Sequence, residues 1–213
     1  MNGAMAGKLV ITFLVAYALG NINPAIILGK LKGIDIRREG SGNAGMTNTI
    51  RVMGLGYGIA VFVVDVLKAF IAVKIGFAFA GTYGAMAGFA GVVIGHCYPA
   101  AFGFMGGKGV AASLGAALAL NWQTALLALL AAGIGFGLTR KMSVGSLAAA
   151  LAYPVLVWYM APDYKYFAIA AAIFLIAMHA GNIKRLVNGE EKALSVGNAD
   201  KTAGDNEEKG DAE

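Results

Sequence analysis

The chain has 213 residues, of which 58% are hydrophobic and only 14% are charged, with a formal net charge of +5. A soluble domain carries about 25% charged residues, and a transmembrane β-barrel shows alternating rather than continuous apolar runs. The composition therefore excludes both classes and predicts an all-α integral membrane protein. A single cysteine, Cys97, also excludes an intramolecular disulfide and a zinc site built from several thiolates.

The apolar runs predict a bundle of about seven transmembrane helices within one membrane-embedded domain, residues 1–192. The predicted spans cover about 9–28, 55–77, 83–101, 110–138, 147–160 and 166–178. The run 110–138 counts as two segments, because Asn121-Trp122-Gln123 interrupts it and each half is short for a span of ~20 residues. These short fourth and fifth segments either cross the membrane twice or enter it and return.

The two ends of the chain differ in composition, since the N-terminal segment is apolar and the C-terminal segment is polar. Ala16-Tyr17-Ala18 fits a signal-peptide cleavage site, but apolar sequence continues well past it, which favours a membrane span. From residue 193 onward the chain is polar and almost free of large apolar side chains. Such a segment cannot bury a core, so residues 193–213 are predicted to form a disordered tail.

Charged and small residues inside the predicted spans indicate how the helices pack. Asp65 and Lys68 lie three residues apart in the second span, so they share a helix face and can pair. Charges at membrane depth face the bundle interior or a polar cavity. A structural ion pair is at least as good an interpretation as a catalytic role. In the third span, glycines spaced by four residues from Gly84 to Gly95 allow close helix approach.

Four polar islands separate the apolar runs, at residues 40–51, 95–108, 139–146 and 179–192. Eleven Lys and Arg residues lie on the side of the islands, whereas only Lys8, Lys74 and Lys165 lie on the other side. The positive-inside rule makes the island side cytoplasmic and places the N-terminus outside. Because all four islands then face the same aqueous surface, the sequence predicts that they form a single site.

The first polar island, GSGNAGMTNTIR, combines hydroxyl, amide and guanidinium groups with three glycines. The glycines allow positive φ angles and a close approach of the backbone to a ligand. The polar groups suit a phosphate or a polyol. The alternative is a polar turn in which Thr47 or Asn48 caps the next helix. The candidate ligand-binding residues are Ser41, Asn43, Thr47, Asn48 and Arg51.

The second polar island contains Gly106-Gly107-Lys108-Gly109 directly before an apolar run that is predicted to be helical. Free backbone N–H groups at a helix start, with glycines and a lysine, can hold an anion. The segment is not a Walker A loop, because Phe102 occupies the first glycine position of that motif and Gly109 follows the lysine. A glycine-rich turn with an interfacial lysine explains these residues equally well.

The fourth polar island places His179, Asn182 and Arg185 at intervals of three residues. If the helix continues through them, they share one face and suit a general base or orienting group beside an anion. No nearby carboxylate orients His179, so a standard triad is not predicted, and a structural histidine is the alternative. His96 is interpreted as structural. Ser143 and Ser146 in the third island are candidate ligand hydroxyls, although serines also cap helices.

Acidic residues are scarce before position 190, where only Asp35, Glu39, Asp65 and Asp163 occur. Metal-dependent phosphotransfer and two-carboxylate acid–base catalysis both need convergent carboxylates. We therefore expect no metal and no other cofactor. An organic-phosphate transporter is the competing class, but a carrier shows an internal repeat and a site near the membrane midplane. A scaffold protein would leave the converging islands unexplained.

Three segments resemble the signatures of the bacterial acyl-phosphate glycerol-3-phosphate acyltransferases. They are SGNAGMTN with Arg51, GHCYPAAFGFMGGKGVA and HAGNIKRLVNGEEK, in family order across nearly the whole hydrophobic chain. The resemblance implies a bundle of seven helices in the bacterial cell (inner) membrane. It also implies acyl transfer from acyl phosphate to the sn-1 hydroxyl of glycerol 3-phosphate. The products would be lysophosphatidate and phosphate, in phospholipid biosynthesis.

The resemblance also implies roles for individual residues. It places Ser41, Arg51, Lys108, His179 and Asn182 around the glycerol phosphate, with His179 and Asn182 as the catalytic pair. It places Gly106, Gly107 and Gly109 near the acyl phosphate, and it adds the hydroxyl of Ser143. Met105 stands where the family usually has a second basic residue, so a basic role is not expected there. The expected partners are glycerol 3-phosphate, acyl phosphate and membrane lipids, with no nucleic acid and a monomer as the starting expectation.

Overall fold

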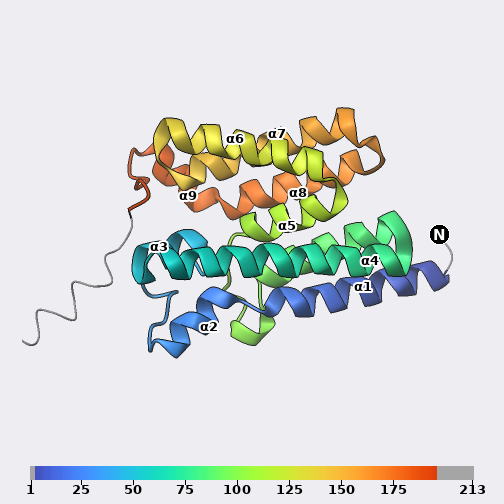
Figure 1. The fold of residues 1–213 in the computed structure, drawn as a ribbon, viewed down its shortest axis with the longest axis horizontal. Coiled ribbons are helices and arrows are strands. Elements are labelled where there is room, and N and C mark those ends of the chain that lie inside the picture. Colours follow the sequence, from blue (N-terminus) through green and yellow to red (C-terminus); the bar gives the residue numbers. More distant parts are fainter. Residues whose placement is uncertain (1–2, 196–213) are drawn as a thin grey trace, which may run out of the picture.

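The computed structural model describes residues 3–195, and every regular element in that range is a helix (Figure 1). α1 and α4 form one layer of the bundle, α6, α7 and α8 form the other, and α5 lies between the layers. The elements are α1 Gly3–Asn21, α2 Pro24–Leu31, α3 Met46–Met53, α4 Leu55–Cys97, η1 Ala100–Phe102, α5 Val110–Leu120, α6 Trp122–Thr139, α7 Met142–Met160, η2 Pro162–Tyr164, α8 Lys165–Met178 and α9 Ala180–Val187.

α4 consists of two helical segments that meet at Ala80 and Gly81. Ala80 has φ −145° and ψ 24°, and Gly81 has φ 60°, a left-handed value that favours glycine. Gly84 packs directly against the carbonyl of Gly76, and Gly88 packs against that of Ala72, so the two segments run antiparallel. They correspond to the predicted spans 55–77 and 83–101, except that the second segment ends at Cys97.

α1 packs against the second segment of α4 with almost no space between the two backbones. A Cβ atom at Gly91 or Gly95 would collide with the carbonyl oxygens of Phe13 or Tyr17, and one at Gly20 would collide with that of Val92. This contact confirms the prediction that the small residues of the third span allow close packing. Larger side chains at these glycines would force the helices apart.

Several helices are suited to cross a membrane by length and composition. They are Gly3–Leu31, Trp122–Thr139 and Met142–Met160, with a fourth if Pro162–Met178 and Ala180–Val187, which are bent by 59°, form one span. The predicted all-α membrane architecture is confirmed, whereas the number seven stays a prediction. The predicted break at residues 121–123 is confirmed, because Asn121 separates α5 from α6 and its side chain accepts a hydrogen bond from Thr124 N at 2.9 Å.

The boundaries differ from prediction around three of the polar islands. α3 begins after Gly45, so neither Thr47 nor Asn48 is its N-cap. The third island is largely helical, because α6 continues to Thr139 and α7 begins at Met142. At His179 the chain bends by 59° between α8 and α9, so the condition that the helix continues straight through the fourth island is not met.

The predicted C-terminal tail falls mainly on residues 196–213, which lie outside the described residues. Its first residues are placed against the bundle. The amide of Leu194 donates a hydrogen bond to the carbonyl of Arg140, at 2.9 Å, in the turn between α6 and α7. The C-terminal part of the described chain therefore returns to the end of the bundle that carries α3 and α9 (Figure 1).

Candidate active site

One cavity of about 900 Å³ is lined by residues from all four polar islands. The islands therefore converge, as the sequence predicts. Of the candidate residues, the structure brings together at this cavity Ser41, Asn43, Thr47, Arg51, Lys108, Gly109, Ser143, His179 and Asn182. Asn48, Gly106 and Gly107 do not line it.

Asn48 shapes the loop that leads into the first island. Its side chain is fully buried, and its Oδ1 accepts a hydrogen bond from Ser41 N at 2.8 Å. Its Nδ2 donates to the carbonyls of Ile36 and Glu39, each at 3.0 Å. Both amide hydrogens are thus used. Asn48 therefore fixes the backbone of Ser41 by a hydrogen bond from outside the cavity. This geometry does not support its predicted role as a ligand-binding residue.

Arg51 supplies a cation to the cavity from the last turn of α3. Thr47 precedes it by four residues, so both lie on the same helix face, and both line the cavity. The Nε of Arg51 is buried and has no hydrogen-bond partner within residues 3–195. A buried polar group without a partner is costly, and a guanidinium stays charged in proteins. Arg51 is therefore suited to bind an anion that enters the cavity.

The glycines of the second island serve a different purpose from the predicted one. Gly106 N donates to the carbonyl of Cys97 and Gly107 N to that of His96, both at 3.1 Å. These two amides are therefore not free for an anion, and the placement of Gly106 and Gly107 near the acyl phosphate stays a prediction. Gly109 does reach the cavity, with φ 84° as the N-cap of α5. The amides of the first turn of α5 that follow it have no intrahelical partner.

Lys108 belongs to a polar network that joins the second island to the fourth. Its Nζ donates to Asn182 Oδ1, and Asn182 Nδ2 donates to Glu191 Oε1 at 2.6 Å. Arg185 Nε donates to the other carboxylate oxygen of Glu191 at 2.7 Å. Burial lowers the pKa of Lys108, the positive charges of Arg185 and Arg51 lower it further, and Glu191 opposes this effect. The network thus connects two cations to one carboxylate, Arg185 directly and Lys108 through Asn182.

Glu191 is the site residue that sequence reasoning missed. α9 ends in a turn where Gly189 has φ 74°, its amide bonds to the carbonyl of Leu186, and Glu190 N bonds to that of Arg185. This pattern is a Schellman motif, and it reverses the chain so that Glu191 returns to the cavity. The only sequence signal was the glycine in the fourth island, which a helix C-terminus favours.

The carboxylate of Glu191 is held in its charged form. Burial alone would raise the pKa of Glu191, but the nearby Ser143 hydroxyl and the hydrogen bonds from Asn182 and Arg185 outweigh it and hold the pKa below its usual value. Its side chain is only 9% exposed. A charged Glu191 orients the side chains of Asn182 and Arg185, which both donate hydrogen bonds to it. The oxygen of the oriented Asn182 amide then accepts the hydrogen bond from Lys108.

His179 lies at the bend between α8 and α9 and is 3% exposed. Its Nδ1 is 2.8 Å from the carbonyl oxygen of Leu175. Because a carbonyl only accepts hydrogen bonds, Nδ1 carries the hydrogen, and the neutral ring has Nε2 as its acceptor. The partner of the ring is a carbonyl rather than a carboxylate, so the arrangement differs from a catalytic triad, as predicted.

The rest of the cavity is mainly apolar and extends between the helices, although Asp65 and His96 also border it. Its walls include Phe62, Phe89, Leu114, Leu129 and Phe136. On α7, Tyr153 lines it ten residues beyond Ser143, or about 15 Å further along the helix axis at ~1.5 Å per residue. The cavity thus combines a charged mouth with an apolar interior. This shape suits a molecule with an anionic head and a long hydrocarbon chain.

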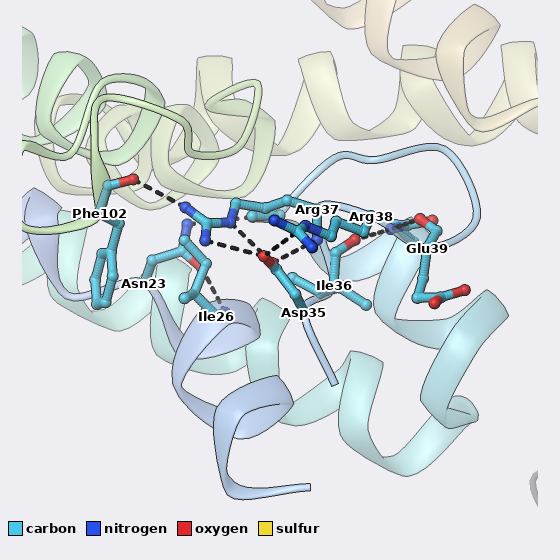
Figure 2. A network of polar contacts seen from close by, with 10 residues as sticks. Asn23, Ile26, Asp35, Ile36, Arg37, Arg38, Glu39 and Phe102 are labelled. Carbon is cyan, nitrogen blue, oxygen red and sulfur yellow. Dashed lines mark hydrogen bonds and ion pairs between the residues drawn. The ribbon is translucent and has the colours of Figure 1, made fainter. Parts of the chain in front are cut away.

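Outside the cavity, Arg37 connects the approach to the first island with the second island. Its Nε and Nη2 contact the two carboxylate oxygens of Asp35 at 2.9 and 3.1 Å, and its Nη1 donates to the carbonyl of Phe102 at 2.9 Å (Figure 2). The Arg37 guanidinium holds the pKa of Asp35 below its usual value. Met105 is 61% exposed and does not line the cavity.

The family assignment follows from comparison with known proteins. Residues 10–189 match the protein family described as "Glycerol-3-phosphate acyltransferase". A relative with that name from Thermoanaerobacter pseudethanolicus (strain ATCC 33223 / 39E) is 41% identical over 188 residues, which are 87% of this chain and 95% of the relative. Another from Synechococcus sp. (strain JA-3-3Ab) is 40% identical over 181 residues, 84% of this chain and 89% of the relative.

Two solved structures agree with this result. Both are of PlsY (YgiH), an integral membrane glycerol 3-phosphate acyltransferase, at 35% identity. The glycerol 3-phosphate form has a TM-score of 0.84 and covers 89% of this chain and 96% of its own. The lysophosphatidic acid form has a TM-score of 0.81 and covers 88% and 95%. This chain therefore belongs to the glycerol-3-phosphate acyltransferase family.

Proposed function

We propose that the protein transfers a fatty acyl group from an acyl phosphate to the sn-1 hydroxyl of glycerol 3-phosphate. The observation that carries this proposal is the cavity itself, with the unpaired Nε of Arg51 and the Lys108–Asn182 pair at its charged mouth and an apolar interior behind them. Two anionic groups must be held together in this reaction, and charge must be stabilised as it develops. Fixed cations and free amides in a partly buried site supply both effects.

The polar end of the cavity is assigned to the phosphates. Arg51 and Lys108 bind phosphate oxygens, and Ser41, Thr47 and Ser143 provide hydroxyls to the glycerol phosphate. The apolar interior is assigned to the acyl chain. PlsY, which this chain resembles, has solved glycerol 3-phosphate and lysophosphatidic acid forms, and this supports the same two kinds of ligand here.

The reaction is one displacement at a carbonyl carbon. The hydroxyl oxygen of glycerol 3-phosphate attacks the acyl carbon, a new ester C–O bond forms, and the C–O bond to phosphate breaks. Phosphate leaves with the bonding electrons, and the hydroxyl proton passes to a base. Nε2 of His179 is an available acceptor, and a phosphate oxygen is the second. An acyl phosphate is a mixed anhydride with a good leaving group, so the reaction needs no metal.

We also propose that the protein lies in the bacterial inner membrane with seven crossings, the N-terminus outside and the active site in the cytoplasm. The charge asymmetry of the sequence supports this orientation, since eleven basic residues lie on the island side and three on the other. The proposal fits the enrichment of Lys and Arg in cytoplasmic loops.

The test is a direct assay of the purified full-length protein in detergent, with acyl phosphate and glycerol 3-phosphate in the presence of EDTA. We expect lysophosphatidate and phosphate to form in equal amounts, and purified acyl-CoA not to replace acyl phosphate. Arg51→Ala serves as the matched control for activity that comes from a contaminant. A strict requirement for Mg²⁺, or transport of glycerol phosphate by vesicles without any acyl transfer, would contradict the proposal.

A further inference from the structure

We infer that the buried ionic cluster of Asp65, Lys68 and His96 on α4 is a positioning device that sets the distance between the first and second polar islands. The inference rests on the proposed function, because the positioned loops are the ones assigned to the substrates. None of the three side chains belongs to the group that touches the phosphates. Their exposures are 1%, 6% and 3%, and Asp65 and His96 border the inner part of the cavity, away from the residues assigned to the phosphates.

The cluster is held together by short contacts centred on one carboxylate oxygen. Oδ1 of Asp65 lies 2.7 Å from Lys68 Nζ and 3.2 Å from His96 Nδ1. Lys68 and Asp65 lie on the first segment of α4, and His96 lies near the end of the second. The cluster therefore fastens the two antiparallel segments together at the end where the second island begins.

Lys68 also reaches the break between α1 and α2. Its Nζ donates to the carbonyls of Ile22 at 2.6 Å and Gly20 at 3.2 Å. The Nζ also lies 2.7 Å from Asp65 Oδ1 in the ion pair and 3.2 Å from His96 Nδ1. Nδ1 of His96 therefore faces both the carboxylate of Asp65 and the ammonium of Lys68, and Nε2 lies at the other edge of the ring.

The α1–α2 break in turn holds the first island. Asn23, the residue after Ile22, donates from Nδ2 to the carbonyl of Ala44 at 3.2 Å, and its side chain is fully buried. Ala44 lies in the middle of the first island, between the cavity-lining residues Asn43 and Gly45. The position of Lys68 is thereby transmitted to the backbone of the substrate-binding loop.

The second island closes the chain of contacts at Gly107. Gly107 N donates to the carbonyl of His96 at 3.1 Å. A Cβ atom at Gly107 would collide with Nε2 of the His96 ring, and it would also lie 2.9 Å from the carbonyl oxygen of Ala44. Only glycine fits between the ring and the first island, and the next residue is Lys108.

These contacts form a closed ring through Lys68, the α1–α2 break, Ala44, Gly107, His96 and Asp65. Every link joins a different pair of segments, and two of the segments carry substrate-binding groups. A buried ion pair is weak evidence for stability, since an apolar pair of similar size often stabilises a fold equally well. The closed ring of contacts suggests a positional role for the buried charges instead of a stabilising one. It fixes Lys108 relative to the loop that carries Ser41 and Arg51.

The test compares variants that keep the protein folded. Asp65→Leu/Lys68→Leu removes both charges together and leaves no uncompensated buried charge. His96→Asn retains an amide donor for Asp65 but removes the ring edge that touches Gly107. Lys74→Met is the matched control, because Lys74 lies on the same helix and stacks on Phe70 at 5.4 Å, away from both loops. Each variant is measured for kcat and KM with both substrates and for its melting temperature in detergent.

We expect kcat/KM to fall about 10- to 100-fold in the double variant and in His96→Asn, because misplacing a binding group by about 1 Å has a cost of this order. Lys74→Met should match the wild type. In a Lys108→Ala background the double variant should cause little further loss, since the ring acts through Lys108 and the effects should not add.

The outcomes separate this inference from the proposed function. A wild-type protein without acyl transfer refutes the proposed function. An active wild type with full kcat/KM in the double variant, or a loss fully additive with Lys108→Ala, overturns the positioning role. If the double variant does not fold, His96→Asn decides alone, and wild-type kinetics there overturn the inference.

Discussion

Replacing Arg51 with alanine should weaken the binding of glycerol 3-phosphate without weakening the fold. The Nε of Arg51 has no partner in the part of the chain that the structure describes, so its removal breaks no internal hydrogen bond at that atom. Lys108, by contrast, is bonded to Asn182, and its loss would disturb the network around Glu191. Arg51 is therefore the cleaner of the two cations to remove.

The expected magnitude follows from the loss of one charge-assisted hydrogen bond to the substrate. Such a bond contributes about 1.5–3 kcal/mol, which corresponds to a roughly 10- to 100-fold fall in kcat/KM. Most of this should appear as a higher KM for glycerol 3-phosphate. Arg51→Lys keeps the charge but loses the planar fork, so it should recover only part of the loss.

Steady-state kinetics with purified variants, together with melting curves, provide the measurement. The melting temperature of Arg51→Ala should stay close to that of the wild type. If both kcat and KM remain near wild type, Arg51 does not bind the substrate phosphate. If the melting temperature falls sharply instead, Arg51 supports the fold, and the reasoning from its unpaired Nε is refuted.

Further predictions concern the rest of the site. His179→Ala should mainly lower kcat, because Nε2 is placed as a proton acceptor or orienting group; an effect on KM alone would refute this. The lowered pKa of Glu191 means that its stabilising effect is present above about 4.5 and is lost as pH falls through the folded-state pKa. The melting temperatures of wild type and Glu191→Gln should therefore converge in acid, and a constant difference down to low pH would contradict this. Tyr153→Ala should extend the apolar interior and shift turnover towards longer acyl chains, tested with acyl phosphates of graded length; an unchanged profile would contradict it. Cysteines introduced at Ser41 and at Asp163 should be labelled from opposite sides of the membrane, and labelling from one side would refute the topology.

The features predicted correctly from the sequence are those that depend on composition and spacing. Continuous apolar runs predict helices, the small residues from Gly84 to Gly95 predict close packing, and the interval between Asp65 and Lys68 predicts their ion pair. The convergence of the four islands also follows, because basic residues mark one end of every apolar run. Helix formation, close packing and the ion pair depend on residues that are near one another in the sequence. The convergence of the islands follows from the membrane, which places all basic ends of the spans on one side.

The sequence expectations and the structure differ where tertiary contacts decide which partner a polar group has. Asn48 has the chemistry of a ligand-binding residue, but its hydrogen bonds to the preceding loop use all of its donors. The amides of Gly106 and Gly107 would be free in an isolated turn, and it is the end of α4 that accepts their hydrogen bonds. Glu191 reaches the site only through the reversal at Gly189. No spacing rule predicts partners that come from distant segments.

The hydrogen bond between Leu194 and Arg140 has a practical consequence for shortening or extending the protein. A polypeptide that stopped at Asn188 would retain every helix of residues 3–187, yet it would lack the carboxylate that orders Asn182 and Arg185. One that stopped at Ser195 would keep both that carboxylate and the anchoring bond. The boundary at which an affinity tag or a fluorescent partner can be joined therefore lies about eight residues beyond the last helix, rather than at its end.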